Sequence, residues 1–407
     1  MSGGIKILMF GWEFPPYNSG GLGVACEGLV RGLVNQGVKI TFVLPKKVDC
    51  QSSLCKIIFA DFNIKSRIFN SLLSPYLTSK SYQDLVRRAG RGGIYRRDLI
   101  SEVLRYGQAG RRIALAEDFD LIHSHDWLSF PAGLAAKKIS HKSLVAHIHA
   151  TEFERTGGHH VNQEIYEIEK EGLSKADMVI AVSNLTKTKI IQHYGIEPEK
   201  VRVVHNAVEY KDFMYLGGDL PDLKSSGQKI VAFVGRITLQ KGPDYFLRAA
   251  KKVLDQRPNV LFIIAGAGDM ERQIIEQAAW LDIADKVLFA GFLRGNELAK
   301  VYQMADLYVL SSVSDPFGMT PLEALANGTP VLISKQSGVA EVLHHCLKVD
   351  FWDIDQMANK ILAVLEQPEL YQCLKENGHQ EVRKLSWQDA ANKCIEVYKE
   401  VLNFSAI

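Results

Sequence analysis

Short runs of apolar residues, each long enough for a buried strand, alternate with segments of helical pattern along most of the chain. In the first half these runs are IKILMF, VKITFVLP, DLIHSH, SLVAHIHA, DMVIAVS and VRVVHNAV. Residues 22–36, between the first two runs, have the period of an amphipathic helix, and Gly37 follows as a stop signal. This alternation is typical of a parallel α/β sheet. We therefore predict a Rossmann-like domain over residues 1–208.

The apolar rhythm stops and then restarts in the second half. Residues 209–228 gather Gly, Pro, Asp and Ser, the composition of a linker. The runs KIVAFVG, NVLFIIAG, KVLFAGF, DLYVLSS and PVLIS then predict a second Rossmann-like domain over residues 229–383. Residues 384–407 are predicted to end the chain as one amphipathic helix, which could pack on either domain. We expect an α/β fold with two such domains facing each other across a cleft.

Composition narrows the class of protein. Hydrophobic residues make up 47% and charged residues 23% of 407 residues, which is typical of a globular protein with sizeable cores. The net charge of +2 argues against nucleic acid as the main partner. No apolar run approaches the roughly 20 residues that span a bilayer, so we expect a cytoplasmic protein. Its six scattered cysteines are expected to be reduced.

One segment departs from this balance. Residues 61–112 carry nine arginines against few acids, and eight of the nine fall within 81–112. Two interpretations remain open: a solvated helical face, or a docking surface for an anionic partner such as membrane head groups.

Ligands of open parallel sheets bind beyond the carboxyl ends of the strands, so the residues after each strand are the candidates for chemistry. After the first strand, Gly20, Gly21 and Gly23 lie next to a predicted helix start, where backbone N–H groups can reach a phosphate. After KIVAFVG, Arg236 and Lys241 share one loop and could clamp a diphosphate. The structural alternatives are a tight turn for the glycines and surface charge for Arg236 and Lys241.

The stretch Ser314 to Val331, SDPFGMTPLEALANGTPV, carries the most information. Thr320, Pro321 and Glu323 fit the N-cap, N1 and N3 positions of a helix. In that arrangement Glu323 would cap the helix without needing a ligand. Asp315 precedes the helix and has no structural role as good, although an Asx turn is an alternative.

Histidines concentrate at the strand ends of the first half. His123 and His125 in HSHDW, and His147 and His149 in HIHATE, are spaced two apart and so face one side of each strand. With Asp126 they allow the alternative of a metal-dependent hydrolase. We rank hydrogen bonding to sugar or phosphate above metal binding.

Taken together, these motifs resemble those of the family 4 glycosyltransferases and the related bacterial and archaeal glycogen synthases, which share the GT-B architecture. The resemblance covers nearly the whole chain. It rests on FGWEFPPYNSGGLG, HSHDW, HIHATE, VVHNAV, VGRITLQKG and SDPFGMTPLEALANGTPV, in family order.

This resemblance implies hexose transfer from a nucleotide sugar to a carbohydrate acceptor, with retention of configuration and without a metal or other cofactor. Arg236 and Lys241 would neutralise the departing diphosphate, together with backbone groups of Gly20 and Gly21 and of Gly318, Met319 and Thr320. Glu323 would hold the ribose, and Asp315 would lie near the transferred sugar. His149 would contact the sugar, with Asp126 and Asn206 nearby.

Two positions depart from the family pattern. Asp315 stands where the family usually has Glu, and its carboxylate has about 1.5 Å less reach. Asn18 and Ser19 stand where glycogen synthases usually have a Lys before the paired glycines. The leading hypothesis is a glycogen-synthase-like retaining transferase that uses UDP- or ADP-glucose, or a related hexose donor. A metal-dependent hydrolase and a nucleotide-sugar-binding regulatory protein remain the alternatives.

Overall fold

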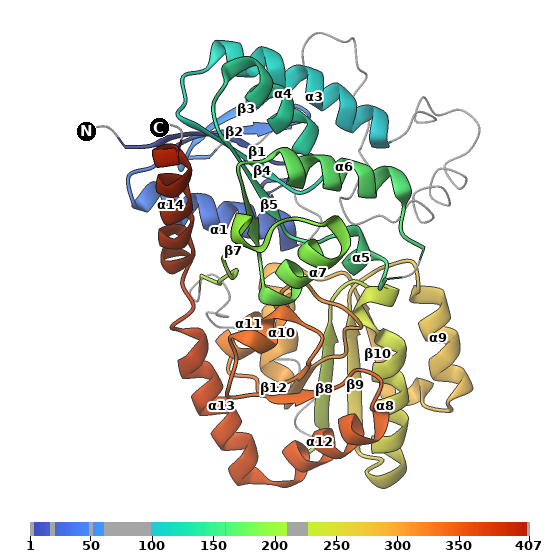
Figure 1. Ribbon diagram of the computed structural model, residues 1–407. Coiled ribbons are helices and arrows are strands. Elements are labelled where there is room, and N and C mark those ends of the chain that lie inside the picture. Colours follow the sequence, from blue (N-terminus) through green and yellow to red (C-terminus); the bar gives the residue numbers. More distant parts are fainter. Residues whose placement is uncertain are drawn as a thin grey trace. The chain divides into compact units, whose positions relative to one another are not determined.

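Two compact units make up the chain. The computed structural model describes residues 4–16, 21–48, 52–60, 99–158, 160–209 and 227–404. Unit 1 comprises residues 1–206 and 387–407, and unit 2 comprises residues 207–386 (Figure 1). The boundary lies at Asn206, close to the end of the last strand predicted for the first domain.

A seven-stranded parallel sheet forms the centre of unit 1, in the order β3-β2-β1-β4-β5-β6-β7. Both strands next to β1 run parallel to it, so the carboxyl ends of β1, β2 and β4 share one edge of the sheet. The strands are β1 (Lys6–Phe10), β2 (Lys39–Leu44), β3 (Lys56–Phe59), β4 (Leu121–His125), β5 (Leu144–Ile148), β6 (Met178–Ala181) and β7 (Val201–Val203).

Helices cover this sheet and bury its apolar side chains. One face packs on α3, α4 and α6, with fully buried residues such as Tyr106, Phe130 and Leu173 in the core. Helix α7 shows why helices form where they do: Ser183 caps its start by accepting from Thr186 N–H, and Gly195 ends it in the left-handed conformation. The helices are α1 (Gly21–Asn35), α3 (Leu99–Ala116), α4 (Phe130–Ser140), α5 (Glu152–Arg155), α6 (Gln163–Lys175), α7 (Asn184–Tyr194) and α14 (Trp387–Phe404).

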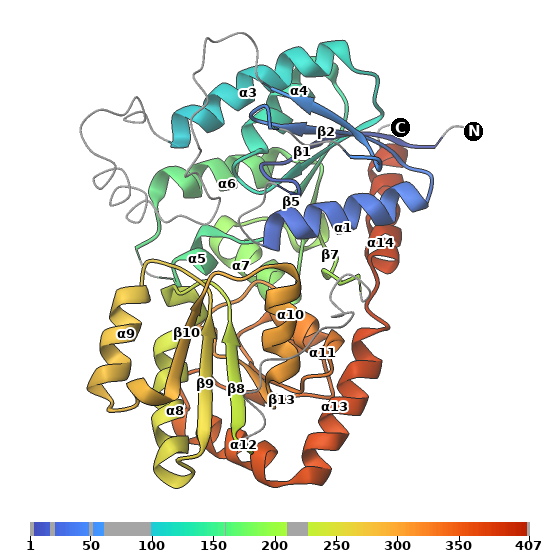
Figure 2. The ribbon, with the colours of Figure 1, turned by 180° about the vertical axis from the view of Figure 1, so that it is seen from behind.

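The last helix, α14, returns to unit 1 and lies beside α1, as Figure 2 shows from behind. Two glycines of α1 make this close approach possible. A Cβ on Gly28 would lie 2.1 Å from the Trp387 ring, and one on Gly32 would lie 2.4 Å from the Trp387 carbonyl oxygen. The placement of α14, which sequence alone left open, therefore depends on the absence of side chains on one stripe of α1.

A six-stranded parallel sheet, in the order β10-β9-β8-β11-β12-β13, forms the centre of unit 2. The topology switches at β8, whose neighbours β9 and β11 continue in opposite directions along the sheet, and ligands of such sheets bind at this position. The strands are β8 (Lys229–Val234), β9 (Val260–Ala265), β10 (Val287–Gly291), β11 (Leu307–Leu310), β12 (Val331–Ser334) and β13 (Leu347–Val349).

The helices of unit 2 follow the strands in alternation. The core under α8, α9 and α12 includes Phe233, Phe246 and Phe262, each almost fully buried. Helices α10 and α11 contact β8, β11 and β12. The helices are α8 (Pro243–Gln256), α9 (Glu271–Trp280), α10 (Gly295–Met304), α11 (Thr320–Ala326), α12 (Ile354–Glu366) and α13 (Pro368–Val382).

The prediction of two parallel-sheet α/β domains is confirmed, but two strands were missed. Strands β3 and β13 lie at the edges of the sheets and are only four and three residues long. Their short sequences, KIIF and LKV, contain too few apolar residues to stand out from the loops around them. Most of the predicted linker, residues 210–226, and of the arginine-rich segment, residues 61–98, lies outside the described residues.

Candidate active site

The loop after β8 carries the two predicted cations of unit 2. Arg236 follows the strand, and its guanidinium donates to Gln240 Oε1 at 2.8 Å. Lys241 ends a short 3₁₀ helix, Leu239–Lys241, and Gly242 follows in the left-handed conformation at φ 61°. A Cβ on Gly242 would lie 2.3 Å from the Ser311 carbonyl oxygen, so glycine is required where this loop passes β11.

The structure brings Lys241 and Asp315 together from the ends of neighbouring strands. Lys241 Nζ donates to Asp315 Oδ2 at 2.6 Å, and Ser312 Oγ donates to the same oxygen at 3.3 Å. The Asp315 side chain is 5% exposed and that of Lys241 is 16% exposed. This buried carboxylate therefore holds the ammonium group in place beside the carboxyl ends of β8 and β11.

Glu323 has a partner other than the predicted one. The N-cap of α11 is Met319, not Thr320, and no side chain caps the helix, so the predicted capping box is wrong. The Glu323 carboxylate instead accepts from Tyr302 Oη at 2.8 Å. Burial raises the pKa of Glu323. The Tyr302 hydrogen bond and the charge of Lys241 act in the opposite direction but are outweighed. Glu323 therefore has no capping role in α11.

Sequence inspection missed the loop after β9. A Cβ on Gly266 would lie 1.8 Å from the Gly235 carbonyl oxygen, and one on Gly268 would lie 2.2 Å from that of Ile237. These two glycines let the β9 loop lie directly against the loop that carries Arg236. This feature could have been recognised in the sequence, as Gly-Ala-Gly directly after an apolar strand. The β9 loop packs against the loop that carries Arg236 and so supports it.

In unit 1, Asp126 positions the residues that follow β5. It has a left-handed backbone, φ 58°, directly after β4. Its Oδ1 accepts from the backbone N–H of His149 at 2.6 Å and of Ala150 at 3.4 Å. Burial raises the pKa of this carboxyl group to about 7. Asp126 thus holds His149 through the backbone of the loop.

A network behind His149 was not identified from sequence. Thr151 and Glu154 form a capping box at the start of α5. Arg155 of the same helix pairs with Glu152 and with the fully buried Glu169. The Thr-x-x-Glu spacing could have been recognised in the sequence. The partner of Arg155 on α6, Glu169, is brought near only by tertiary packing. These contacts fix the loop that carries His149.

The four predicted histidines gather on one face of the sheet. His123 Nε2 and His147 Nδ1 are 3.3 Å apart, and His125 Nδ1 and His149 Nε2 are 3.0 Å apart. His123 Nδ1 also bonds to Tyr398 Oη at 2.6 Å. Burial lowers the pKa of His149 and of His123 to about 3. The rings are therefore neutral at pH 7.

The remaining predicted residues are spread over both units. Gly21 is the first residue of α1, and Asn206 is 8% exposed at the end of unit 1. Gly318 has φ 93°, and a Cβ there would lie 3.5 Å from Asp315 Oδ2. Met319 and Thr320 follow, with Thr320 Oγ1 2.7 Å from Tyr308 Oη. Gly20 lies outside the described residues.

Two family comparisons divide the chain as the units do. The family described as "Glycosyltransferase Family 4" matches residues 19–211, and "Glycosyl transferases group 1" matches residues 221–381. A D-inositol 3-phosphate glycosyltransferase of Segniliparus rotundus is 30% identical over 70% of this chain and 67% of its own length. The chain belongs to the family 4 glycosyltransferases.

Further relatives of this glycosyltransferase match over nearly their whole length. An uncharacterised glycosyltransferase of Methanocaldococcus jannaschii is 29% identical over 97% of this chain and 98% of its own. The glycogen synthase of Mycobacterium tuberculosis is 24% identical over 97% and 94%.

Solved structures agree on the GT-B fold. The sucrose-phosphate synthase of Thermosynechococcus elongatus has a TM-score of 0.79 at 21% identity, covering 99% of this chain and all of its own. An Anabaena protein solved in complex with UDP-glucose has a TM-score of 0.69 at 17% identity, covering 97% of this chain and all of its own.

Family membership decides between the three hypotheses on the general class of protein. This chain is a glycosyltransferase, not a metal-dependent hydrolase or a regulatory protein. The hydrolase hypothesis also needed Asp126 as a metal ligand, whereas one of its oxygens accepts from two backbone N–H groups. Within the described part of the chain, no helix has the length and apolar character needed to cross a membrane.

Proposed function

We propose that this glycosyltransferase moves a hexose, with glucose as the first candidate, from a UDP- or ADP-linked donor to a carbohydrate acceptor, with retention of configuration and without a catalytic metal. The observation that carries the proposal is the buried pair of Lys241 and Asp315, 2.6 Å apart, with Lys241 on the same loop as Arg236. Two cations at the carboxyl end of a switch-point strand suit a diphosphate, and the carboxylate beside them suits the hydroxyl groups of a sugar.

The donor would be held mainly by unit 2. Arg236 and Lys241 would face the diphosphate, where negative charge grows as the sugar leaves. Backbone N–H groups of Gly318, Met319 and Thr320 would add to this stabilisation, as would those of Gly20 and Gly21 in unit 1. Glu323 would accept from the ribose hydroxyls, and its bond from Tyr302 at 2.8 Å orients the carboxylate for that contact.

The transferred sugar would contact His149, with Asp126 and Asn206 nearby. Since burial lowers the pKa of His149 to about 3, its ring is neutral at pH 7 and would hydrogen bond to a hydroxyl group rather than transfer a proton. The bond between the anomeric carbon and the diphosphate oxygen breaks, and the acceptor oxygen bonds to the same face. The acceptor proton passes to the diphosphate, so no protein base is required.

The activities of relatives define the acceptors to test. These relatives include a D-inositol 3-phosphate glycosyltransferase and a glycogen synthase, and a sucrose-phosphate synthase shares the fold. The acceptor panel is therefore an α-glucan, D-inositol 3-phosphate and a sugar phosphate. The UDP-glucose complex of the Anabaena neighbour makes that donor the first one to try.

The test is a donor panel followed by a transfer assay. UDP- and ADP-linked hexoses are screened by thermal shift, because a ligand that binds only the folded state raises the apparent stability. Donors that shift the melting temperature are then incubated with the acceptor panel in the presence of EDTA, and release of nucleoside diphosphate is followed from the first minutes. Turnover with EDTA present supports the proposal. Turnover that appears only when magnesium or manganese is added would overturn its metal-free mechanism.

A further inference from the structure

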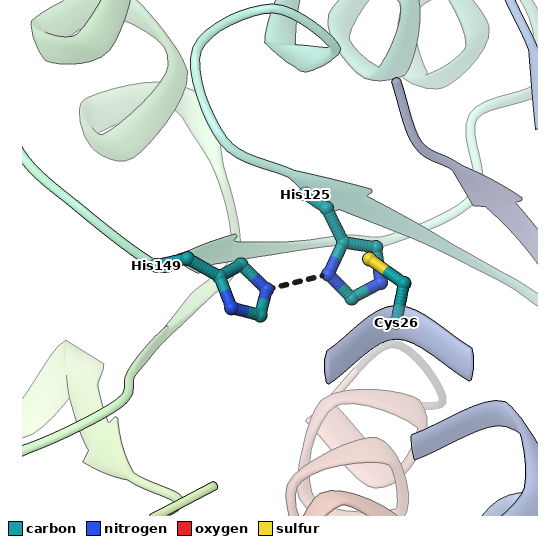
Figure 3. Close-up of side chains that lie close together, drawn as sticks. All are labelled: Cys26, His125 and His149. Carbon is teal, nitrogen blue, oxygen red and sulfur yellow. Dashed lines mark hydrogen bonds between the residues drawn. The ribbon is translucent and has the colours of Figure 1, made fainter. Parts of the chain in front are cut away.

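A second cluster of reactive side chains lies inside unit 1. It consists of Cys26 on α1, His125 at the end of β4 and His149 just after β5, and we call it the Cys-His cluster. One ligand atom from each residue lies within 4.8 Å of those of the other two. Figure 3 shows the three side chains converging from these elements. None of the steps proposed above uses Cys26 or His125.

Local structure explains why the three residues meet. His125 is aligned with His147 across the β4–β5 pair, and His149 lies two residues beyond His147, so its side chain faces the same way. Cys26 belongs to the buried stripe of α1 that includes Leu22, Leu29 and Leu33. Helix α1 therefore presents its thiol to the face of the sheet on which the histidines gather.

The cluster is deeply buried and incompletely hydrogen bonded. Cys26 and His125 are fully buried and His149 is 7% exposed. Among the described residues, His125 Nε2 and His149 Nδ1 have no hydrogen-bond partner. An unsatisfied buried polar group costs about 1–3 kcal/mol, and the other two ring nitrogens, His125 Nδ1 and His149 Nε2, have only each other as partners in the part of the chain that the structure describes.

We propose that Cys26, His125 and His149 together bind a zinc ion. One thiolate with two imidazoles is a ligand set that favours zinc over magnesium, calcium or manganese, which prefer oxygen. With Zn–N near 2.0–2.1 Å and Zn–S near 2.3 Å, tetrahedral ligand atoms lie about 3.3–3.6 Å apart. His125 Nδ1 and His149 Nε2, which are hydrogen bonded at 3.0 Å in this structure, are close to that separation, and a zinc ion would replace their hydrogen bond.

An overlapping set, His123, His125 and His147, is less suited to a metal. Its three ligand atoms also lie within 4.8 Å of one another. Both ring nitrogens of His123, however, already have partners, Tyr398 Oη at 2.6 Å and His147 Nδ1 at 3.3 Å. A metal there would have to break one of these bonds without gaining a thiolate ligand. In the Cys-His cluster a metal would replace only the hydrogen bond between His125 and His149, and it would gain the Cys26 thiolate.

The ion would join the start of α1 to the ends of β4 and β5. Its role is structural, and the transfer reaction proposed above does not pass through it. His149 is common to both proposals and is therefore left unchanged in the test. The readouts are metal content and spectra, so failure of this proposal and failure of the proposed function can be told apart.

The first test measures metal in the protein as purified without a histidine tag or chelator. Elemental analysis is expected to find about one zinc per chain. Cys26→Ser is expected to lose most of it, and Cys394→Ser, which changes another fully buried free cysteine of unit 1, is expected to keep it. Zinc-free wild-type protein that also gains no thermal stability on zinc addition would overturn the proposal, and so would a Cys26→Ser protein with wild-type zinc content.

The second test needs no variant and remains informative if Cys26→Ser does not fold. Cobalt(II) is exchanged into the wild-type protein in place of zinc. A thiolate-to-cobalt charge-transfer band in the near ultraviolet, with visible bands of tetrahedral intensity, is expected for one cysteine and two histidine ligands. Cobalt that binds without the thiolate band would exclude Cys26 as a ligand and overturn the site as proposed.

Discussion

Replacing Lys241 with alanine removes the ammonium group that pairs with Asp315 at 2.6 Å. If Lys241 stabilises charge on the leaving diphosphate, its loss should lower kcat/KM by about 10²–10³, or about 3–4 kcal/mol of transition-state stabilisation. Breaking a fully buried ion pair costs about 3–5 kcal/mol of stability. Because the Lys241 side chain keeps 16% exposure and Ser312 still bonds to Asp315, we expect a stability loss below that range, about 2 kcal/mol.

The double variant Lys241→Ala/Asp315→Ala separates these two effects. Removing both charges should recover most of the lost stability, since a buried pair replaced on both sides is often neutral. It should not recover turnover. The control is Lys251→Ala, which breaks an exposed pair with Asp255 on α8 and should change neither quantity.

Initial rates of nucleoside diphosphate release at several donor concentrations, together with urea unfolding, measure both quantities for each variant. The reasoning would be refuted if the Lys241→Ala enzyme kept a kcat/KM near the wild-type value and its rate still saturated with donor. A double variant that regains turnover would also contradict it, because Lys241 would then serve only to neutralise Asp315.

Three further predictions concern other contacts. Glu323→Gln keeps an oxygen for the Tyr302 hydrogen bond but removes a carboxyl group whose pKa is raised by burial. In the wild type, the stability that Glu323 contributes through its raised pKa is present at acid pH and lost as pH rises through the folded pKa. The variant should therefore be more stable than wild type above neutral pH, with a shrinking difference on acidification, and should bind donor more weakly. Gly28→Ala should lower stability by about 1–2 kcal/mol, since overpacking against Trp387 outweighs the roughly 1 kcal/mol gain in helix propensity, and Trp387→Leu should reduce that loss. Asp315→Glu should lower kcat/KM, because the Asp315 side chain is only 5% exposed and the added methylene has little room at this buried position.

Each of these predictions has an outcome that would contradict it. A constant stability difference between Glu323→Gln and wild type across pH would mean that this carboxyl group does not titrate differently on folding. Additive effects of Gly28→Ala and Trp387→Leu in urea unfolding would show that the two residues are not in contact. Unchanged kinetics for Asp315→Glu would show that the reach of this carboxylate is not critical.

Much of the fold was readable because most central strands of parallel sheets are long apolar runs between helices. The edge strands β3 and β13 were not, because three or four residues carry too little pattern. The return of α14 to unit 1 depends on a contact between Gly28 and Trp387, more than 350 residues apart in the sequence. Such long-range contacts leave no local signal.

The sequence predicted which residues form the candidate site better than it predicted the contacts between them. The pairing of Lys241 with Asp315 follows from the neighbouring positions of β8 and β11, which strand order along the chain does not reveal. The capping assignment for Glu323 failed because the helix begins one residue earlier than the Thr-Pro-x-Glu spacing indicated, and Tyr302 of α10 provides the hydrogen bond. Similarly, one partner of Arg155, Glu169, comes from a separate helix.

The central claim is retaining transfer from a nucleotide sugar without a catalytic metal. The most direct measurement is proton NMR of the reaction of UDP- or ADP-α-glucose with the acceptor panel in the presence of EDTA, since the anomeric coupling reports configuration. We predict release of nucleoside diphosphate and an α-linked product from its first appearance. A β-linked product would contradict retention, and absence of any transfer by folded protein across the donor and acceptor panels would contradict the proposed reaction.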